Sequence, residues 1–164
     1  MLLKLRKIND FIVKLTSIFA IIIMALITIV VGIQVFTRIL LNNTVVWSEE
    51  VARMLTFWVV GLGASIGFRR GENMAVNFFI EKIPIKQRNY IELFLYLAIG
   101  YFLLIFLKTG LDYSISNLNH TTPILQIHYT YFSAIIPFSV TLMILYSIEK
   151  IIETVVNIKD DLVN

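Results

Sequence analysis

The chain has 164 residues, of which 58% are hydrophobic and only 15% charged, and its mean hydropathy is +0.82. A soluble domain is about half apolar and about a quarter charged, so this composition excludes a soluble globular protein and indicates an integral membrane protein. The absence of cysteine excludes disulfide exchange and thiolate metal sites. The net charge of +3 comes from basic residues beside apolar runs, which favours membrane orientation over nucleic-acid binding.

The first apolar run follows Lys4, Arg6 and Lys7, as the core of a signal peptide would. However, residues 15–37 form a charge-free stretch of 23 residues, longer than a typical signal core of about 7–15, and no Ala-x-Ala-like site closes it. We therefore predict a retained membrane helix over about 11–36.

The second run is free of charge only over 54–68, about 22 Å as helix, which is too short for a hydrocarbon core of about 30 Å. We therefore predict a helix over 47–68. Glu49, Glu50 and Arg53 then lie in its first two turns, where charge is costly and usually serves a purpose.

These first turns admit a structural and a functional interpretation. Ser48 would accept a backbone N–H as a helix cap, Glu49 and Arg53 would pair at i,i+4, and Trp47 suits the interfacial aromatic belt. One carboxylate, Glu49 or Glu50, is then left without a partner in this segment. The alternative is that one of these charges pairs with another protein.

The second span is also rich in small residues. Gly63-x-x-x-Gly67 and Gly61-x-x-x-Ser65 would let another helix approach closely, whether from this chain or from a second one. Trp58, one turn before them, favours packing over ligand binding. The candidate partner-contact residues are Trp47, Glu49, Glu50, Arg53, Trp58, Gly61, Gly63 and Gly67.

The connection over 69–88 mixes basic and apolar residues. A short amphipathic helix lying in the headgroup plane would place Phe78 and Phe79 in lipid and Lys82 in water. The alternative is an ordinary amphipathic turn packed on its own helices. The candidate membrane-interface residues are Arg69, Arg70, Phe78, Phe79, Lys82, Lys86 and Arg88.

Two more spans are predicted over about 89–111 and 129–148, giving one four-helix membrane domain over 1–164. Pro137 lies well inside the fourth span and should kink it. The uncharged connection before it suits contact with a protein or with headgroups, or is a plain loop. His120 and His128 lie there, so we interpret them as surface residues rather than as haem ligands deep among the helices.

Lys and Arg predict the orientation. Eleven of the fourteen lie in the N-terminal segment up to Lys14, in the 69–88 connection or in the tail after the fourth span, whereas Arg38, Arg53 and Lys108 lie on the other side. The positive-inside rule then places both termini in the cytoplasm.

Chemical groups are missing where a carrier or an enzyme would need them. No Asp, Glu, Lys or Arg lies at the middle of a span, as proton-driven carriers generally require, and no nucleophile–base pair or phosphate loop is present. Sodium-coupled carriers use inverted repeats and broken helices, for which four spans leave little room. We predict no enzyme, no catalytic residue, no metal and no cofactor, but a four-helix subunit that assists another protein.

The whole pattern resembles the small membrane subunit, DctQ-like, of TRAP transporters (tripartite ATP-independent periplasmic transporters). The second helix of that family opens with Trp-Ser-Glu-Glu and a following arginine, and it continues through a small-residue segment to an Arg–Gly exit. The matching residues here are Trp47, Ser48, Glu49, Glu50, Arg53, Trp58, Gly61, Gly63, Arg69 and Gly71, followed before and inside the fourth helix by Thr122, Pro123 and Pro137.

The chain departs from the family pattern at four positions. Asn73 and Asn77 stand where a His and an Asp are often found, His128 replaces a proline, and Ser133 replaces a tyrosine. Any role tied to the missing charged groups therefore does not carry over.

The resemblance implies partners and a mechanism. A large membrane subunit would hold the substrate and sodium sites for symport, and a soluble periplasmic binding protein would deliver an organic acid, sialic acid or a C4-dicarboxylate. This chain would be a scaffold in the bacterial inner membrane, in contact with lipids, and its outer edge would help to dock the binding protein. No nucleic acid is involved.

Other classes remain open. A dimeric small multidrug-type exporter needs a carboxylate embedded in the membrane, and the first span has none after Asp10. A membrane anchor of a redox enzyme needs haem-ligating histidines among the helices. A stand-alone structural four-helix membrane protein makes no such demand.

Overall fold

A computed structural model describes residues 2–40, 45–70 and 85–163, with side chains described except at 85–88 and 160–163. The described elements are all helical: α1 (Leu2–Leu40), α2 (Val46–Arg70), α4 (Ile85–Ser116), α5 (Thr130–Ser133) and α6 (Ile135–Val163). The predicted interfacial helix lies outside these residues, as do Phe78, Phe79 and Lys82 and the side chains of Lys86 and Arg88.

Four described segments are long and apolar enough to cross a membrane: Leu2–Leu40, Val46–Arg70, Asn89–Ser116 and Thr130–Lys159. The predicted class, an all-α integral membrane protein with four long helices, is therefore confirmed. The helices continue past the predicted spans because their polar ends remain helical. Helix α1 begins at Leu2, for example, nine residues before the predicted first span.

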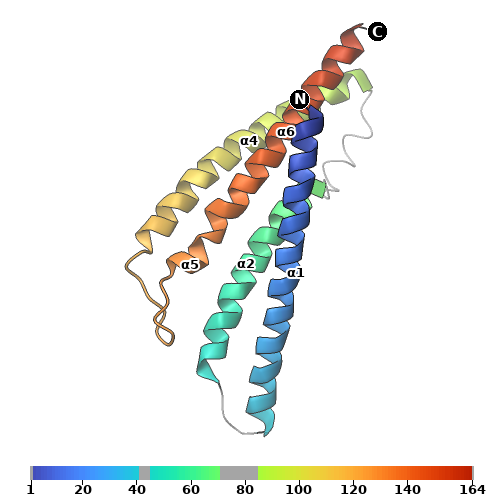
Figure 1. Ribbon diagram of the computed structural model, residues 1–164. Coiled ribbons are helices and arrows are strands. Elements are labelled where there is room, and N and C mark those ends of the chain that lie inside the picture. Colours follow the sequence, from blue (N-terminus) through green and yellow to red (C-terminus); the bar gives the residue numbers. More distant parts are fainter. Residues whose placement is uncertain (1, 41–44, 71–84, 164) are drawn as a thin grey trace.

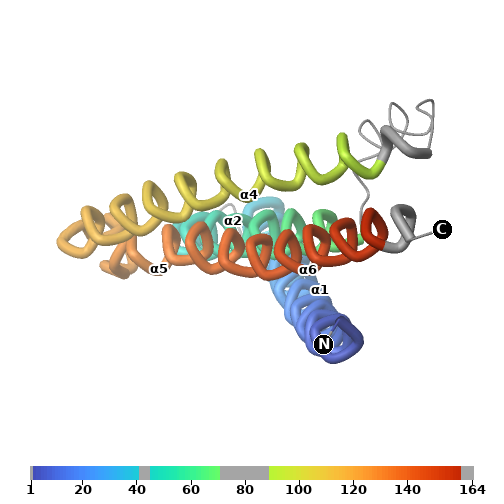
Figure 2. Tube along the Cα trace, turned by 90° about the horizontal axis from the view of Figure 1, so that it is seen from above, coloured from blue at the N-terminus to red at the C-terminus, as the bar shows by residue number. Residues whose placement is uncertain are grey.

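The helices form a row rather than a closed bundle. Helix α6 packs against α4 on one side and α2 on the other, and α1 packs along α2 with a smaller contact to α6. Among the described residues, α4 contacts neither α1 nor α2. Figure 2 shows α1 running away from the layer that α2, α6 and α4 make. Large helix faces are therefore left uncovered by the described residues.

The two ends of the protein along the helix axes differ. Figure 1 shows the N-terminus and the C-terminus at one end, which we call the terminal end, and the connection from α4 to α5 at the opposite end. We call that opposite end the hairpin end. Successive long helices run back and forth between these two ends (Figure 1), which agrees with four crossings of one membrane.

Spacing explains the packing of α1. Its buried or half-buried side chains recur every three or four residues, which is the seam of a helix packed along one partner. The seam runs through Leu2, Leu5, Asn9, Ile12, Thr16, Ala20, Ile23, Ile27, Val30, Gln34 and Thr37. The remaining faces are exposed and apolar over 15–37, as lipid contact requires.

Helix α6 carries two such seams, which makes it the centre of the row. A Cβ at Gly61 of α2 would lie 2.5 Å from Ile135 Cγ1, and a Cβ at Gly110 of α4 would lie 2.9 Å from Ile136 Cγ2. Neighbouring residues 135 and 136 thus face opposite partners. Val140 and Tyr146 are each 1% exposed, so the core follows this helix. Glycine lets the helices approach closely, which is how packing is gained where lipid offers no hydrophobic drive.

The fourth span is divided near its start. Helix α5 ends at Ser133 and α6 begins at Ile135, so Pro137 lies in the first turn of α6 rather than mid-span. Proline lacks an N–H and crowds the carbonyl four residues earlier, here that of Ser133, so the regular helix stops before it. The Trp58 indole N–H donates to the Tyr131 carbonyl at 2.9 Å across this break.

Candidate functional site

Helix α2 presents a single exposed stripe. Its exposed residues recur every three or four positions between two covered sides, where α1 and α6 pack. The stripe, called here the α2 stripe, consists of the exposed Glu49, Arg53, Thr56, Phe57, Val60, Gly63 and Ala64, and it continues to the half-buried Gly67. Phe57 is 50% and Val60 63% exposed, so the stripe is largely apolar below its charged first turns.

The glycines divide into used and unused positions. A Cβ at Gly61, Gly100 or Gly110 would meet atoms of α6 within 4 Å. A Cβ at Gly63, Gly67 or Gly32 would meet nothing within 4 Å. Of the predicted contact glycines, Gly61 is therefore occupied inside the chain, whereas Gly63 and Gly67 remain open to a second chain.

The charged residues predicted in the first turns of α2 divide into an exposed pair and a buried carboxylate. Arg53 donates to Glu49 Oε1 at 3.0 Å, with the two side chains 61% and 67% exposed, so this pair lies at the surface. Glu50 is turned the other way and is 8% exposed. Its Oε1 accepts the Ile124 N–H and its Oε2 the Leu125 N–H, each at 3.0 Å. The carboxylate without a local partner is therefore satisfied by backbone from the distant loop.

That loop, residues 117–129, folds as a small hairpin. The Thr122 N–H donates to the Ile127 carbonyl and the Tyr129 N–H to the His120 carbonyl, both at 2.9 Å. Gln126 has a positive φ of 53°, which closes the turn. The hairpin and Glu50 together fasten the start of α6 to the start of α2.

The remaining predicted residues of this end lie as follows. Trp47 is 43% exposed in the first turn of α2. Ser48 does not cap the helix as predicted, because α2 begins two residues earlier at Val46, and its hydroxyl instead donates to the Val45 carbonyl at 2.6 Å. His120 and His128 are exposed, and His128 Nδ1 lies 3.0 Å from the Leu118 carbonyl.

A second polar cluster lies at the terminal end. The Arg69 guanidinium donates to Asp10 Oδ1 and Glu149 Oε1, each at 2.9 Å, and Asn9 donates to the other oxygen of Glu149. The side chains of Arg69 and Glu149 are only 12% and 3% exposed. Arg69 was predicted at the membrane interface, and here it points into the junction of α1, α2 and α6. Arg70, beside it, is exposed.

Sequence reasoning missed Asn9, Asp10 and Glu149. A signal was present, because Glu149 is the first charge after a long neutral stretch and ends an otherwise apolar span. A carboxylate in that position needs a cation. Which cation it takes depends on the crossing of α2 and α6, which the sequence does not give.

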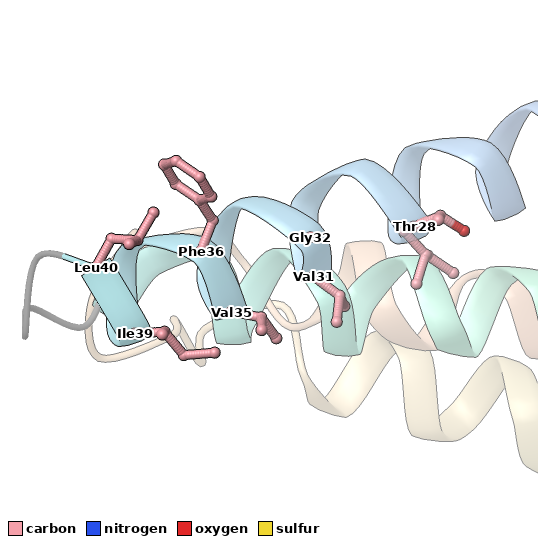
Figure 3. A pocket seen from close by; sticks show the side chains of 8 residues that line it. Thr28, Val31, Gly32, Val35, Phe36, Ile39 and Leu40 are labelled. Atoms are coloured by element: carbon pink, nitrogen blue, oxygen red, sulfur yellow. The ribbon is translucent and has the colours of Figure 1, made fainter.

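Helix α1 carries an open hollow on its exposed side. The hollow has a volume of about 820 Å³ and is lined by residues between Ile27 and Leu40. Figure 3 shows Val31, Val35 and Ile39 along one flank and Phe36 on another, with Gly32 between them. It is apolar throughout and holds no group for recognition beyond the Thr28 hydroxyl.

Within the described part of the chain, no three His, Cys, Asp or Glu residues are grouped as a metal site. The four long apolar helices define a multi-pass membrane protein. The family model described as tripartite ATP-independent periplasmic transporters, DctQ component, matches residues 27–157. The chain belongs to this family and is a transporter component, not an enzyme.

Two relatives are informative. The chain is 32% identical over 97 residues to the sialic acid TRAP transporter small permease protein SiaQ of Vibrio cholerae, which covers 59% of this chain and 56% of that protein. It is 28% identical over 78 residues to the sialic acid TRAP transporter permease protein SiaT of Haemophilus influenzae, covering 48% of this chain and 13% of that protein. The alignment thus spans about half the length of the first relative.

Proposed function

We propose that this chain is the small membrane subunit of a sodium-coupled TRAP transporter that takes up organic acids, sialic acid in the first place and C4-dicarboxylates as the second class. It acts as a fixed scaffold for a large membrane subunit. The observation that carries the proposal is the α2 stripe, where Gly63 and Gly67 leave room for a helix that the described part of this chain does not supply.

The similarity to SiaT supports the pairing with a large subunit. That permease protein contains a segment similar to this chain, and the match covers only 13% of its length. A small part joined to a much larger remainder suits two units that work side by side. The sialic acid proposal rests on the names of both relatives, and the C4-dicarboxylate class rests on the family resemblance, since neither comes from a residue of this chain.

The remaining parts of the proposal follow from charge. The concentration of Lys and Arg residues toward the terminal end supports an orientation with that end in the cytoplasm and the hairpin end in the periplasm, in the bacterial inner membrane. There the hairpin would help to dock a soluble binding protein. Sodium would bind in the large subunit, because no described span of this chain has a charged group at its centre.

The test is co-purification of the large subunit with this chain carrying Gly63→Leu. A Cβ at this position meets no atom of the described residues within 4 Å, so the variant should fold. A leucine on the stripe should hold a partner helix away, and we expect recovery of the large subunit to fall at least tenfold.

The matched control is Gly32→Leu, which adds the same side chain at an equally open glycine on α1. It should leave recovery unchanged. Equal recovery with wild type and Gly63→Leu would sink the assignment of the stripe. Recovery of the wild-type chain alone, or as a homodimer, would favour the exporter or stand-alone classes instead.

A further inference from the structure

A pocket of about 150 Å³ opens between the first turns of α2 and the hairpin. Its α2 wall is formed by Glu49, Glu50 and Arg53. At roughly 30 Å³ per water molecule, the pocket holds about five waters, a volume that one long side chain fills.

The charges around the pocket do not cancel. Two carboxylates and one guanidinium line it, so its formal charge is negative. Glu50 is held by the Ile124 and Leu125 amides, which are neutral groups. The exposed Glu49–Arg53 pair is of the kind that contributes little and opens readily, so Glu49 is available to a second cation.

The opposite wall of the pocket also suits a cationic side chain. Tyr129 and Phe132 lie there with ring centroids 5.4 Å apart, next to Pro123. Aromatic faces attract cations, and the methylene stem of a lysine or arginine packs on apolar surface while its charged head stays at the rim. Acidic rim, aromatic wall and narrow volume together define a site for an ammonium or guanidinium group.

We propose that this pocket binds a lysine or arginine side chain of the large membrane subunit, an inference that rests on the proposed function. Glu49 and Arg53 line the pocket and also begin the α2 stripe, so the pocket is continuous with the face assigned to that subunit. The stripe itself is apolar and would allow a partner helix to slide. A charged side chain of the partner helix, bound in the pocket at the end of the stripe, would fix the register of that helix along α2.

The test depends on the sign of two substitutions, with the apparent Kd measured by titrating labelled large subunit against this chain in mild detergent. Glu49→Gln removes a carboxylate and should raise the apparent Kd about fivefold. Arg53→Gln leaves the pocket more negative and frees Glu49, so it should lower the Kd. The matched control, Asp112→Asn, removes an exposed carboxylate at the same end on α4 and should change nothing.

The opposite pattern, weaker binding with Arg53→Gln alone, would mean an anion site and would overturn the inference. An unchanged Kd with Glu49→Gln would overturn it as well. All three residues are exposed, so loss of folding does not confuse the comparison. Failure of the wild-type chain to bind any large subunit would reject the proposed function itself, whereas tight binding that ignores Glu49 rejects only the pocket.

A second measurement identifies the source of the cation. Zero-length carbodiimide coupling in native membranes joins a carboxylate to a nearby amine, and mass spectrometry reads the product. An amide between Glu49 and a lysine of the large subunit supports the proposal. An amide to phosphatidylethanolamine would show a lipid occupant and overturn it. The Kd pattern above without a coupled product assigns the partner as arginine, which does not react.

Discussion

Glu50 and Glu49 are adjacent in sequence and have opposite surroundings. The carboxylate of Glu50 accepts two backbone amides that lie 74 and 75 residues further along the chain. Glu49 faces outward and, among the described residues, pairs with Arg53. One helix turn therefore supplies both an internal fastening and a surface charge, because consecutive residues point about 100° apart around a helix.

The fastening predicts how the hairpin responds to Glu50→Ala. The Ile124 and Leu125 amides lose their acceptors, so their hydrogen–deuterium exchange should accelerate about tenfold or more. Glu49→Ala removes the neighbouring carboxylate and should leave both amides protected. Exchange measured by mass spectrometry on the purified protein decides the matter. Unchanged protection in Glu50→Ala would show that the hairpin holds its shape without this contact.

Trp58 shows a different use of a polar atom at an interface. Its indole N–H reaches the Tyr131 carbonyl where the fourth span is interrupted, and its ring lies 6.4 Å from that of Phe138. Broken helices are tolerated in membranes when a neighbour supplies the missing hydrogen bond. This contact agrees with the prediction that Trp58 packs rather than binds a ligand. A contact between Trp58 and a partner protein is not needed to explain the tryptophan at this position.

The sequence was sufficient to predict that four long helices exist, but not which helices pack against one another. Four long apolar runs are visible in the sequence because each must cross about 30 Å of hydrocarbon. Gly61 and Gly63 look equivalent in the sequence. Gly61 packs on Ile135 and Gly63 faces open space, since two residues along a helix turn a side chain by about 200°. Spacing identifies a face, and only the crossing of α2 and α6 decides which face is covered.

The terminal cluster binds three elements at one point. Arg69 of α2 connects Asp10 of α1 with Glu149 of α6, and Asn9 adds a second contact from α1. Away from this junction α1 depends almost entirely on α2. The Glu149 carboxylate, at the end of an apolar span, thus lies where α1, α2 and α6 meet. The sequence does not show that these helices meet there, and Arg69 was therefore predicted at the membrane surface.

We expect Arg69→Gln to destabilise the protein by about 3–5 kcal/mol, because it leaves Glu149 buried without its cation. The double variant Arg69→Gln with Glu149→Gln removes both charges and should recover part of that loss. Thermal unfolding of the purified protein in detergent measures both, together with the single variant Glu149→Gln. Lys150→Gln is the control, since its pair with Glu153 is one-third exposed and should contribute less than about 1 kcal/mol. Strictly additive effects of the two single changes would argue against a shared ion pair.

The whole molecule is a row whose two ends carry different chemistry. The terminal end gathers most of the basic residues and the buried ion pair, whereas the hairpin end is fastened by Glu50 and is nearly free of charge after Asp112. Unlike a closed bundle, a row leaves part of the surface of each helix without a neighbour among the described residues, as the α2 stripe shows. Such a shape has uncovered surface to offer a larger neighbour along its length, which is how a scaffold subunit would use four helices without a transport path of its own.

The asymmetry predicts the orientation of the chain in the membrane. Because the natural sequence has no cysteine, a single one can be introduced at an exposed position of either end, Gln126→Cys in the hairpin or Asn157→Cys in α6. A maleimide that does not cross membranes should label Gln126→Cys in spheroplasts, while Asn157→Cys should react only after the membrane is opened. The reason is that Lys and Arg are held on the cytoplasmic side during insertion. Labelling of Asn157→Cys from outside would reverse the orientation, and the hairpin and the pocket beside it would then face the cytoplasm, out of reach of any periplasmic partner.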